Sequence, residues 1–222
     1  MPLTVSDDSA LRTGIDLQMV NSMQINLQLL ENLTDSPIEN TRVIAVSNDG
    51  FGNVTLKSSD INGNISDDFD IVKEADWIVE AVVERIDIKH QIYDKIFKSR
   101  KDGAIVSSNT SSIPIKVLSQ NLTNEQKKDF CITHFFNPVR YMGLLEIVKN
   151  ENNDLEKING LQKFCEIELG KGAIVCNDTP GFLGNRVGVY AMQIAMTEAF
   201  KMKLTVEEAD AIFGRPMGIP KT

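Results

Sequence analysis

Residues 77–107 read WIVEAVVERIDIKHQIYDKIFKSRKDGAIVS, and this stretch decides the fold class. It begins with the short apolar run Trp77 to Val83, which is typical of a buried strand. An amphipathic segment from about Asp87 to Ser99 has the spacing of a helix, and a second apolar run follows at Ala104 to Ser107. A strand, a helix and another strand at these lengths predict a crossover unit in a parallel sheet.

The same alternation continues outward from this unit. A short helix is expected from Asp70 onward, before the first strand. After the second strand we expect a helix at Ile113 to Gln120, strands at Cys131 to Phe135 and Leu144 to Val148, a helix at about Asp154 to Leu169 and a strand at Ala173 to Cys176. The predicted fold class is therefore α/β, with a doubly wound, mostly parallel sheet and right-handed crossovers.

The carboxyl-terminal residues follow a purely helical pattern. Helices are predicted at Leu183 to Met202 and at Val206 to Phe213, and Thr205 and Glu208 have the spacing of a capping box for the second of these. Residues 180–222 are therefore expected to be the truncated start of an all-helical domain.

Residues 1–59 show neither pattern clearly. Within residues 9–33, apolar side chains recur at the three-four spacing of a helix face, at Val20, Met23, Leu27 and Leu30. We therefore predict a helix there. Two β-prone segments, Arg42 to Val46 and Val54 to Leu56, flank a turn-like stretch at Asn48 to Asn53, which predicts a hairpin. The expected domains are a divergent amino-terminal region at 1–59, a sheet domain at 60–179 and the helical segment at 180–222.

Charge and composition disfavour several classes of function. The net charge of −8 argues against a nucleic-acid-binding surface, which needs clustered Lys and Arg. The cysteines, Cys131, Cys165 and Cys176, have no Cys-x-x-Cys spacing and no histidine cluster nearby, so we predict small core residues and no metal site. No window holds the roughly 18 apolar residues of a membrane span, and no secretory signal is visible. We expect a cytoplasmic protein without nucleic-acid or membrane partners.

Two residues have the chemistry of a general base. His134 lies at the end of a predicted strand, and Glu146 is a single acid inside the next, otherwise apolar strand. If these strands pair, the carboxylate can orient the imidazole and stabilise the imidazolium that forms when the ring takes a proton. Oxidation of a secondary alcohol needs such a base. The alternative is a half-buried histidine bonded to the backbone.

Polar residues elsewhere are less decisive. Residues 107–112 read SSNTSS and follow a short buried strand, where open α/β sheets bind ligands. A loop or a helix cap explains such a run equally well. Asn185 follows Pro180 and Gly181 on a predicted helix, and it is either a surface amide or a side chain that faces a cleft.

Several motifs occur together in one order. They are Val79 to Glu84 (VEAVVE), Ser108 to Ser112 (SNTSS), His134 to Val139 (HFFNPV), Glu146, Asp178 to Phe182 (DTPGF) with Asn185 and Arg186, and Gly214 to Gly218 (GRPMG). This set resembles the 3-hydroxyacyl-CoA dehydrogenase family over about residues 60–222. The resemblance implies a Rossmann-like sheet domain and NAD-dependent oxidation of (S)-3-hydroxyacyl-CoA to 3-oxoacyl-CoA in fatty-acid β-oxidation.

The resemblance also implies roles for individual residues. His134 would be the catalytic base and Glu146 its orienting partner. Ser111 and Asn185 would bind the substrate oxygens and the nicotinamide. The residues along the nicotinamide half of NAD would be Glu84, Lys89, Asn109, Ser111 and Asn137. The partners implied are an acyl-CoA substrate and, through the helical domain, a second copy in a homodimer.

One part of the family pattern is not visible in this sequence. Members begin with a strand, a Gly-x-Gly-x-x-Gly turn and a helix, whose free N–H groups hold the pyrophosphate of NAD. Here the nearest glycines, Gly50 and Gly52, lie between β-prone segments and favour a hairpin turn. Two hypotheses follow: an active dehydrogenase, or an inactive fragment or degenerate relative that acts as a binding module. A dehydrogenase for sugars or 2-hydroxy acids is disfavoured by the pairing of HFFNP with DTPGF.

Overall fold

The computed structural model describes residues 15–20, 24–29, 43–46, 58–59, 65–66, 69–137, 139 and 141–218. Before residue 72 only the backbone is described. The chain divides into two compact units, Met1–Thr179 and Pro180–Thr222, and each is considered by itself.

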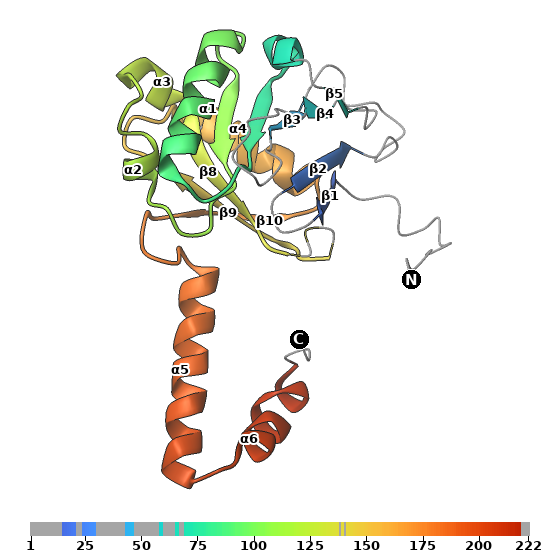
Figure 1. Ribbon diagram of the computed structural model, residues 1–222, viewed down its shortest axis with the longest axis vertical. Helices are drawn as coiled ribbons and strands as arrows, with labels where there is room; N and C mark the ends of the chain where they lie inside the picture. Colours follow the sequence, from blue (N-terminus) through green and yellow to red (C-terminus); the bar gives the residue numbers. More distant parts are fainter. Residues whose placement is uncertain are drawn as a thin grey trace, which may run out of the picture. The chain divides into compact units, whose positions relative to one another are not determined.

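A six-stranded sheet forms the centre of the first unit (Figure 1). In spatial order its strands are β10 (Gly172–Cys176), β9 (Leu144–Lys149), β8 (Phe130–Phe135), β7 (Ile105–Ser108), β6 (Trp77–Glu80) and β3 (Val43–Val46). Strands β3, β6, β7 and β8 run parallel to one another, β9 is antiparallel to β8, and β10 is parallel to β9. The predicted α/β class and mostly parallel sheet are confirmed.

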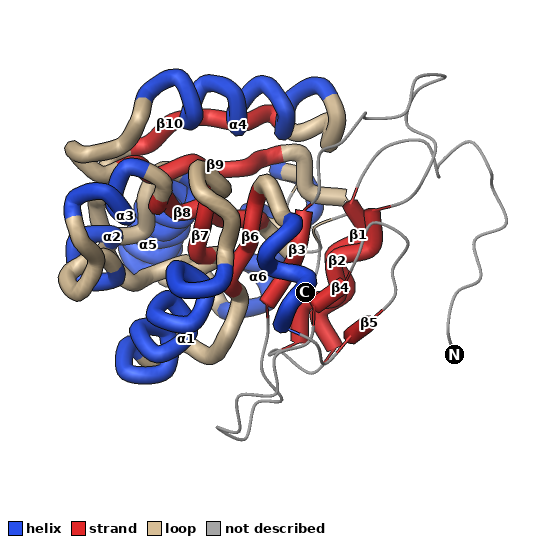
Figure 2. Tube along the Cα trace, turned by 90° about the horizontal axis from the view of Figure 1, so that it is seen from above, coloured by secondary structure: helices blue, strands red, loops and turns tan. Residues whose placement is uncertain are grey.

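Helices lie on both sides of this sheet, with α4 (Leu155–Ile167) and α1 (Ile86–Ser99) on opposite faces (Figure 2). Successive side chains of a strand point to opposite faces, so one strand can supply two cores. In β6, Trp77 joins the cluster that includes Leu161 of α4, whereas the Glu80 carboxylate contacts Tyr93 of α1. Both faces of the strand are therefore buried, which explains why its sequence is a continuous apolar run rather than an alternating one.

The other helices that the structure describes in this unit are short. They are η2 (Phe69–Glu74), α2 (Ile115–Leu118) and α3 (Asn124–Lys128). The long helix α4 begins after Asp154, whose carboxylate accepts hydrogen bonds from the N–H groups of Glu156 and Lys157. Such a cap satisfies donors that have no partner inside the helix, and this explains why the helix starts at this position.

The helix predicted within residues 9–33 is wrong. The chain instead forms two antiparallel strands, β1 (Ile15–Val20) and β2 (Gln24–Leu29). Apolar residues stand opposite apolar residues in this ladder, since Leu17 pairs with Leu27 and Met19 with Ile25. The segment has an alternating pattern, IDLQMV and QINLQL, as well as the three-four spacing that suggested a helix. The period of two prevailed because pairing of the strands satisfies both the hydrogen bonds and the apolar pattern.

The hairpin predicted around Asn48 to Asn53 is tested only at its first strand. That strand, β3, pairs in parallel with β6 at the edge of the large sheet. Residues 47–57, which include the predicted turn and the second segment of the hairpin, lie outside the described residues. Two further short strands, β4 (Ser58–Ser59) and β5 (Ile65–Ser66), pair antiparallel with each other.

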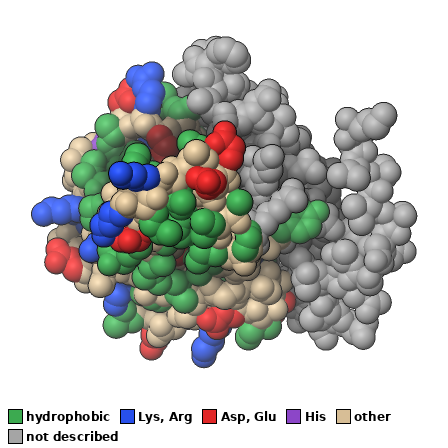
Figure 3. Space-filling view, turned by 90° about the horizontal axis from the view of Figure 1, so that it is seen from below, with side chains coloured by type: hydrophobic (Ala, Val, Ile, Leu, Met, Phe, Trp, Pro, Cys, Tyr) green, Lys and Arg blue, Asp and Glu red, His purple; other side chains and the backbone are tan. Residues whose placement is uncertain are grey.

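The second unit consists of helices, as predicted. These are α5 (Gly184–Met202), α6 (Val206–Phe213) and the short η3 (Arg215–Met217). The capping box is confirmed, because Thr205 Oγ1 accepts from the N–H of Glu208 and Glu208 Oε2 accepts from the N–H of Thr205. Apolar side chains are exposed along α5 and α6, and hydrophobic atoms are prominent on the face shown in Figure 3. No helix among the described residues is long and apolar enough to cross a membrane.

Candidate active site

His134 and Glu146 lie directly opposite each other on the antiparallel strands β8 and β9. The Nδ1 atom of His134 is 2.7 Å from Oε2 of Glu146, and the two side chains are 7% and 0% exposed. Charge-assisted hydrogen bonds have this length. The contact that sequence reasoning required for a histidine and carboxylate pair is therefore present.

The local sequence places this pair on a buried face of the sheet. In β9, Leu145 and Ile147 belong to the core cluster that includes residues of α4, so Glu146 between them faces the other side of the sheet. The ring of Phe136 packs at 4.5 Å from the imidazole, centroid to centroid. The pair is thus held in an environment that excludes most water, where charge interactions are stronger than in solution.

The loop after β7 contacts the end of β8 beside this histidine. The backbone N–H of Phe135 donates to Oδ1 of Asn109 at 3.0 Å. Asn109 therefore fixes the position of the strand residue that follows His134. The carboxyl ends of β6, β7 and β8 lie at one edge of the sheet, which is the edge where open α/β sheets bind ligands.

Glu84 and Ser111 lie together at this same edge. The Oε1 atom of Glu84 accepts from Oγ1 of Thr110 at 2.7 Å and from the N–H of Ser111 at 3.1 Å. The side chain of Glu84 is 42% exposed, and Ser111 is exposed as well. A carboxylate that faces solvent at this position can accept a hydrogen bond from a ligand hydroxyl.

Lys89 lies beneath this carboxylate and is only 1% exposed. Its Nζ donates to Oε1 of Glu80 at 2.8 Å and to the carbonyl of Val82 at 3.2 Å, and it forms an ion pair with Oε2 of Glu84 at 3.2 Å. The structure therefore places Lys89 against protein groups, and its neighbour Glu84 is the one that faces solvent.

The buried carboxylate of Glu80 was missed by sequence reasoning. It is fully buried, and its second oxygen accepts from the hydroxyls of Tyr93 and Ser108, each at 2.7 Å. Burial, with the Glu80 charge beside it, raises the pKa of Tyr93 well above its usual value, so the phenol remains a donor. The signal was available, since Glu80 is a single acid in an apolar strand, as Glu146 is.

Two predicted residues occupy other positions. Asn137 is exposed in the connection between β8 and β9. Asn185 is the second residue of α5, in the second unit, where it lines a hollow of about 450 Å³ with residues that include Arg186 and Tyr190. Gly181 precedes this helix with φ of 73°, and a Cβ atom there would approach the backbone nitrogen of Arg186 to 3.3 Å.

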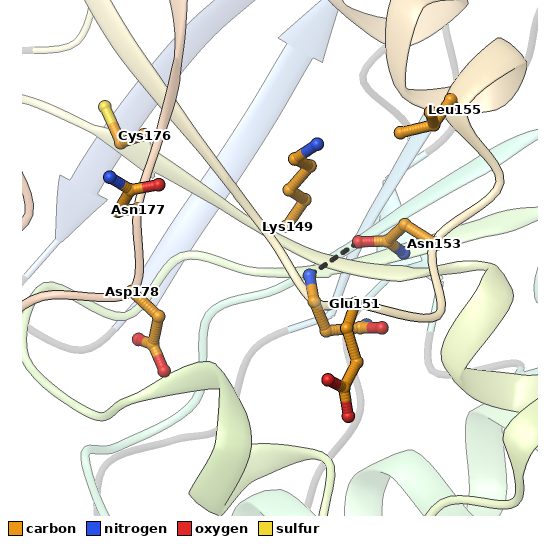
Figure 4. Close-up of a pocket in the computed structure, with 8 residues that line it drawn as sticks. Lys149, Glu151, Asn153, Leu155, Cys176, Asn177 and Asp178 are labelled. Atoms are coloured by element: carbon orange, nitrogen blue, oxygen red, sulfur yellow. Dashed lines mark hydrogen bonds between the residues drawn. The ribbon is translucent and has the colours of Figure 1, made fainter.

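A second hollow, of about 330 Å³, opens beyond the carboxyl ends of β9 and β10 (Figure 4). Because β9 is antiparallel to β8, this hollow is at the opposite edge of the sheet from Phe135. Its residues include Lys149, Glu151 and Asp178. The Asp178 carboxylate accepts from the N–H groups of Ile115 and Lys116, so it caps α2. The hollow contains neither residue of the histidine and carboxylate pair.

The three cysteines are free and buried, which confirms the prediction that they are core residues. Burial raises the pKa of the Cys131 thiol well above its usual value and that of Cys165 to about 12. A thiolate is the nucleophilic form of cysteine, so these two side chains do not have the properties of catalytic nucleophiles.

Named relatives match about 70% of this chain. The putative fatty acid oxidation complex trifunctional enzyme of Rickettsia prowazekii is 44% identical over 160 residues, which are 72% of this chain and 22% of that protein. The probable 3-hydroxyacyl-CoA dehydrogenase of Deinococcus radiodurans is 40% identical over 156 residues, which are 70% of this chain and 45% of that protein. The chain thus spans less than half the length of these relatives.

Solved structures are also similar to this chain. FadB2 of M. tuberculosis aligns with a TM-score of 0.57 and 30% identity, over 64% of this chain and 50% of that one. The (S)-3-hydroxybutyryl-CoA dehydrogenase PaaH1 of Ralstonia eutropha aligns with a TM-score of 0.58 and 29% identity, over 64% of this chain and 50% of that one.

The family model described as 3-hydroxyacyl-CoA dehydrogenase, NAD binding domain, matches residues 10–179. The match begins well before residue 60, where the resemblance noted in the sequence began. It ends at the residue where the first compact unit ends. The chain therefore belongs to the 3-hydroxyacyl-CoA dehydrogenase family and contains its NAD-binding domain.

Proposed function

We propose that the protein oxidises (S)-3-hydroxyacyl-CoA to 3-oxoacyl-CoA with NAD, with His134 as the general base and Glu146 as the residue that orients it. The observation that supports this most directly is the 2.7 Å contact between His134 Nδ1 and Glu146 Oε2. The names of relatives support the substrate class, because they include a probable 3-hydroxyacyl-CoA dehydrogenase and an (S)-3-hydroxybutyryl-CoA dehydrogenase.

The geometry of the pair assigns a role to each imidazole nitrogen. An ionised carboxylate only accepts hydrogen bonds, so Nδ1 carries the proton that faces Glu146. The neutral ring then has its lone pair on Nε2, and this atom takes the proton of the substrate hydroxyl. Bound NAD supplies the acceptor for the hydride that leaves carbon. The imidazolium that forms is stabilised by the Glu146 carboxylate, whose charge is buried beside it.

The residues at the edge of the sheet where β6, β7 and β8 end fit the ribose of NAD that lies next to the nicotinamide. Glu84 offers a half-exposed carboxylate oxygen to ribose hydroxyls, and the exposed Ser111 is held next to it by a hydrogen bond. Asn109 acts by holding the end of β8. Strand β3 runs parallel to β6, so it also ends at this edge, and residues 47–57 continue from there outside the described residues.

The remaining assignments belong to the same proposal. Asn137 contributes an amide to the cofactor, and Asn185 hydrogen-bonds the substrate oxygens. The 3-hydroxyacyl-CoA thioester is the small-molecule partner, and a homodimer, which the family resemblance implies, stays a prediction.

The decisive experiment compares two histidine variants. With (S)-3-hydroxybutyryl-CoA and NAD, His134→Ala should reduce turnover by about 10²- to 10⁴-fold, the usual effect of losing a general base. Glu146→Gln should also slow turnover, because the imidazolium loses its charged partner. The matched control is His90→Ala, since His90 is the other histidine of the chain and its ring contacts Val117 O and Asn121. Near-normal turnover of His134→Ala in an active form of the protein would exclude His134 from the mechanism.

A second candidate function is that of a binding module without dehydrogenase activity. It is favoured by one observation, namely that residues 1–59 contain no Gly-x-Gly-x-x-Gly sequence for the pyrophosphate. Titration of the chain with NADH distinguishes the two functions. Saturable binding supports the dehydrogenase, whereas no binding up to several millimolar supports the module.

A further inference from the structure

The strongest unexplained feature is the buried polar cluster around Glu80. Its carboxylate receives four hydrogen bonds: Oε1 from Nζ of Lys89 at 2.8 Å and from the N–H of Val82 at 2.6 Å, and Oε2 from the hydroxyls of Tyr93 and Ser108. A carboxylate has about four acceptor positions, so Glu80 is saturated. A saturated carboxylate can stay ionised in the interior, where an unsatisfied one could not.

The cluster joins β6, α1 and β7 at the edge of the sheet where Glu84 and Ser111 lie. Glu80 ends β6, Lys89 and Tyr93 lie on α1, and Ser108 ends β7. All four residues are 1% exposed or less. Replacement of such a pair by apolar residues is often neutral or stabilising in proteins, so stability alone does not explain why two opposite charges are buried here.

The contacts of Lys89 suggest what the pair does. Its ammonium group bridges the buried Glu80 and the half-exposed Glu84, at 2.8 and 3.2 Å. The other oxygen of Glu84 accepts from Thr110 Oγ1 and from the N–H of Ser111. A continuous series of contacts therefore runs from the buried cluster to the exposed loop.

We propose that Glu80 and Lys89 are positioning residues for NAD binding: Glu80 fixes the ammonium group of Lys89, which fixes the Glu84 carboxylate and, through it, the backbone at Ser111. This inference rests on the proposed function for its cofactor, and it assigns Lys89 an indirect role. Glu84 is the group that touches the ribose. Without the ammonium group beneath it, the Glu84 carboxylate would lose its ion pair and could turn toward solvent.

The test uses a double variant that conserves net charge, Glu80→Gln with Lys89→Met. It removes both buried charges. The introduced amide can still accept from the N–H of Val82 and form hydrogen bonds with the hydroxyls of Tyr93 and Ser108. We expect a urea unfolding midpoint close to that of the unmodified protein. The NADH dissociation constant should nevertheless rise about tenfold, the effect of losing one hydrogen bond to a charged group. If Glu80 and Lys89 contributed only to stability, NADH binding would be unchanged in this folded variant.

A second measurement does not depend on the cofactor. In the unliganded protein, hydrogen exchange of the Ser111 amide, followed by NMR, should accelerate about tenfold in the double variant, because its acceptor is no longer held. Amides of the ladder between β6 and β7 should keep their protection. The control is Asp129→Asn, which removes a buried charge paired with Arg100 and Lys157 at the amino end of β8. It should lower stability without changing Ser111 exchange or NADH binding.

A third variant tests whether the pair acts through Glu84. Glu84→Gln alone should weaken NADH binding and accelerate Ser111 exchange. Added to the double variant, it should produce little further change, because the three residues act in series. Additive effects, or unchanged Ser111 exchange in a folded double variant, would overturn the proposal. If the unmodified protein binds no NADH, the proposed function fails, and Ser111 exchange still decides whether the pair positions the loop.

Discussion

The contact between His134 and Glu146 predicts an asymmetry in stability that can be measured without turnover. Both side chains are buried, at 7% and 0% exposed. His134→Ala leaves the Glu146 carboxylate buried without the ring that lies 2.7 Å from it. Glu146→Gln instead leaves an amide of nearly the same shape, whose oxygen can still accept from Nδ1. The histidine variant should therefore be the less stable of the two.

The expected losses of unfolding free energy follow from the interaction that each variant removes. The neutral His134 ring donates a hydrogen bond to a charged carboxylate, and loss of such a bond costs about 1.5–3 kcal/mol, so we expect His134→Ala to fall in this range. Glu146→Gln converts a charged hydrogen bond into a neutral one, for an expected cost of about 1–2 kcal/mol. His90→Ala, at a partly exposed ring, should cost less than about 1 kcal/mol.

Urea unfolding followed by tryptophan fluorescence measures these differences. The chain has one tryptophan, Trp77, which is 3% exposed and stacks on Phe135, the neighbour of His134, at 6.4 Å between ring centroids. Its emission therefore reports on the sheet that carries the pair. The shift of the urea midpoint, at an unchanged dependence of the unfolding free energy on urea concentration, gives the change in unfolding free energy. If Glu146→Gln cost as much as His134→Ala, or if His134→Ala cost less than about 1 kcal/mol, a hydrogen bond from the ring to a buried, charged carboxylate would be refuted.

Three further predictions concern other parts of the chain. NAD should bind weakly, with a dissociation constant of about 1 mM, or about 4 kcal/mol, because residues 1–59 contain no Gly-x-Gly-x-x-Gly sequence; calorimetry that found micromolar binding would point to a phosphate site near Gly50 and Gly52. Asp178→Ala should destabilise the first unit by about 0.5–2 kcal/mol, because α2 loses its cap, whereas Asp178→Asn should retain part of it in the same urea assay. Stability should fall as pH rises above 9.0, because burial raises the pKa of Cys165 to about 12, so the folded state keeps a proton that the unfolded thiol releases. Cys165→Ala should make this decline less steep between about pH 9 and 10. An unchanged slope of stability against pH would contradict the contribution of Cys165.

Much of the fold could be predicted because its elements carry local signals. The apolar runs at β6, β7 and β10 and the amphipathic pattern of α1 are typical of a sheet covered on both faces. The candidate pair was also predictable, since a lone histidine and a lone acid occur on consecutive apolar strands with a short connection between them. These inferences needed only periodicity, spacing and side-chain chemistry.

Periodicity failed where one segment satisfied two patterns. Residues 15–29 fit both a helix face and alternating strands, and only the pairing of β1 with β2 selects the second. The predicted run from Trp77 to Val83 likewise stops being a strand at Glu80, where the N–H of Val82 turns to the Glu80 carboxylate. Where a strand ends depends on whether its backbone groups bond to a neighbouring strand or to a nearby side chain. The pattern of apolar residues along the sequence does not show which of these occurs.

The tertiary structure alone decided which charged groups meet. A shift of one residue in the pairing of β8 with β9 would put His134 and Glu146 on opposite faces, and the observed register places them directly opposite each other. Lys89 is nine residues from Glu80 in the chain, and Ser108 is 28 residues from it, yet both bond to its carboxylate. The sequence named the residue types available for chemistry and the strands that carry them. Their partners depended on strand register and helix packing, because these bring together groups whose separation along the chain has no regular period.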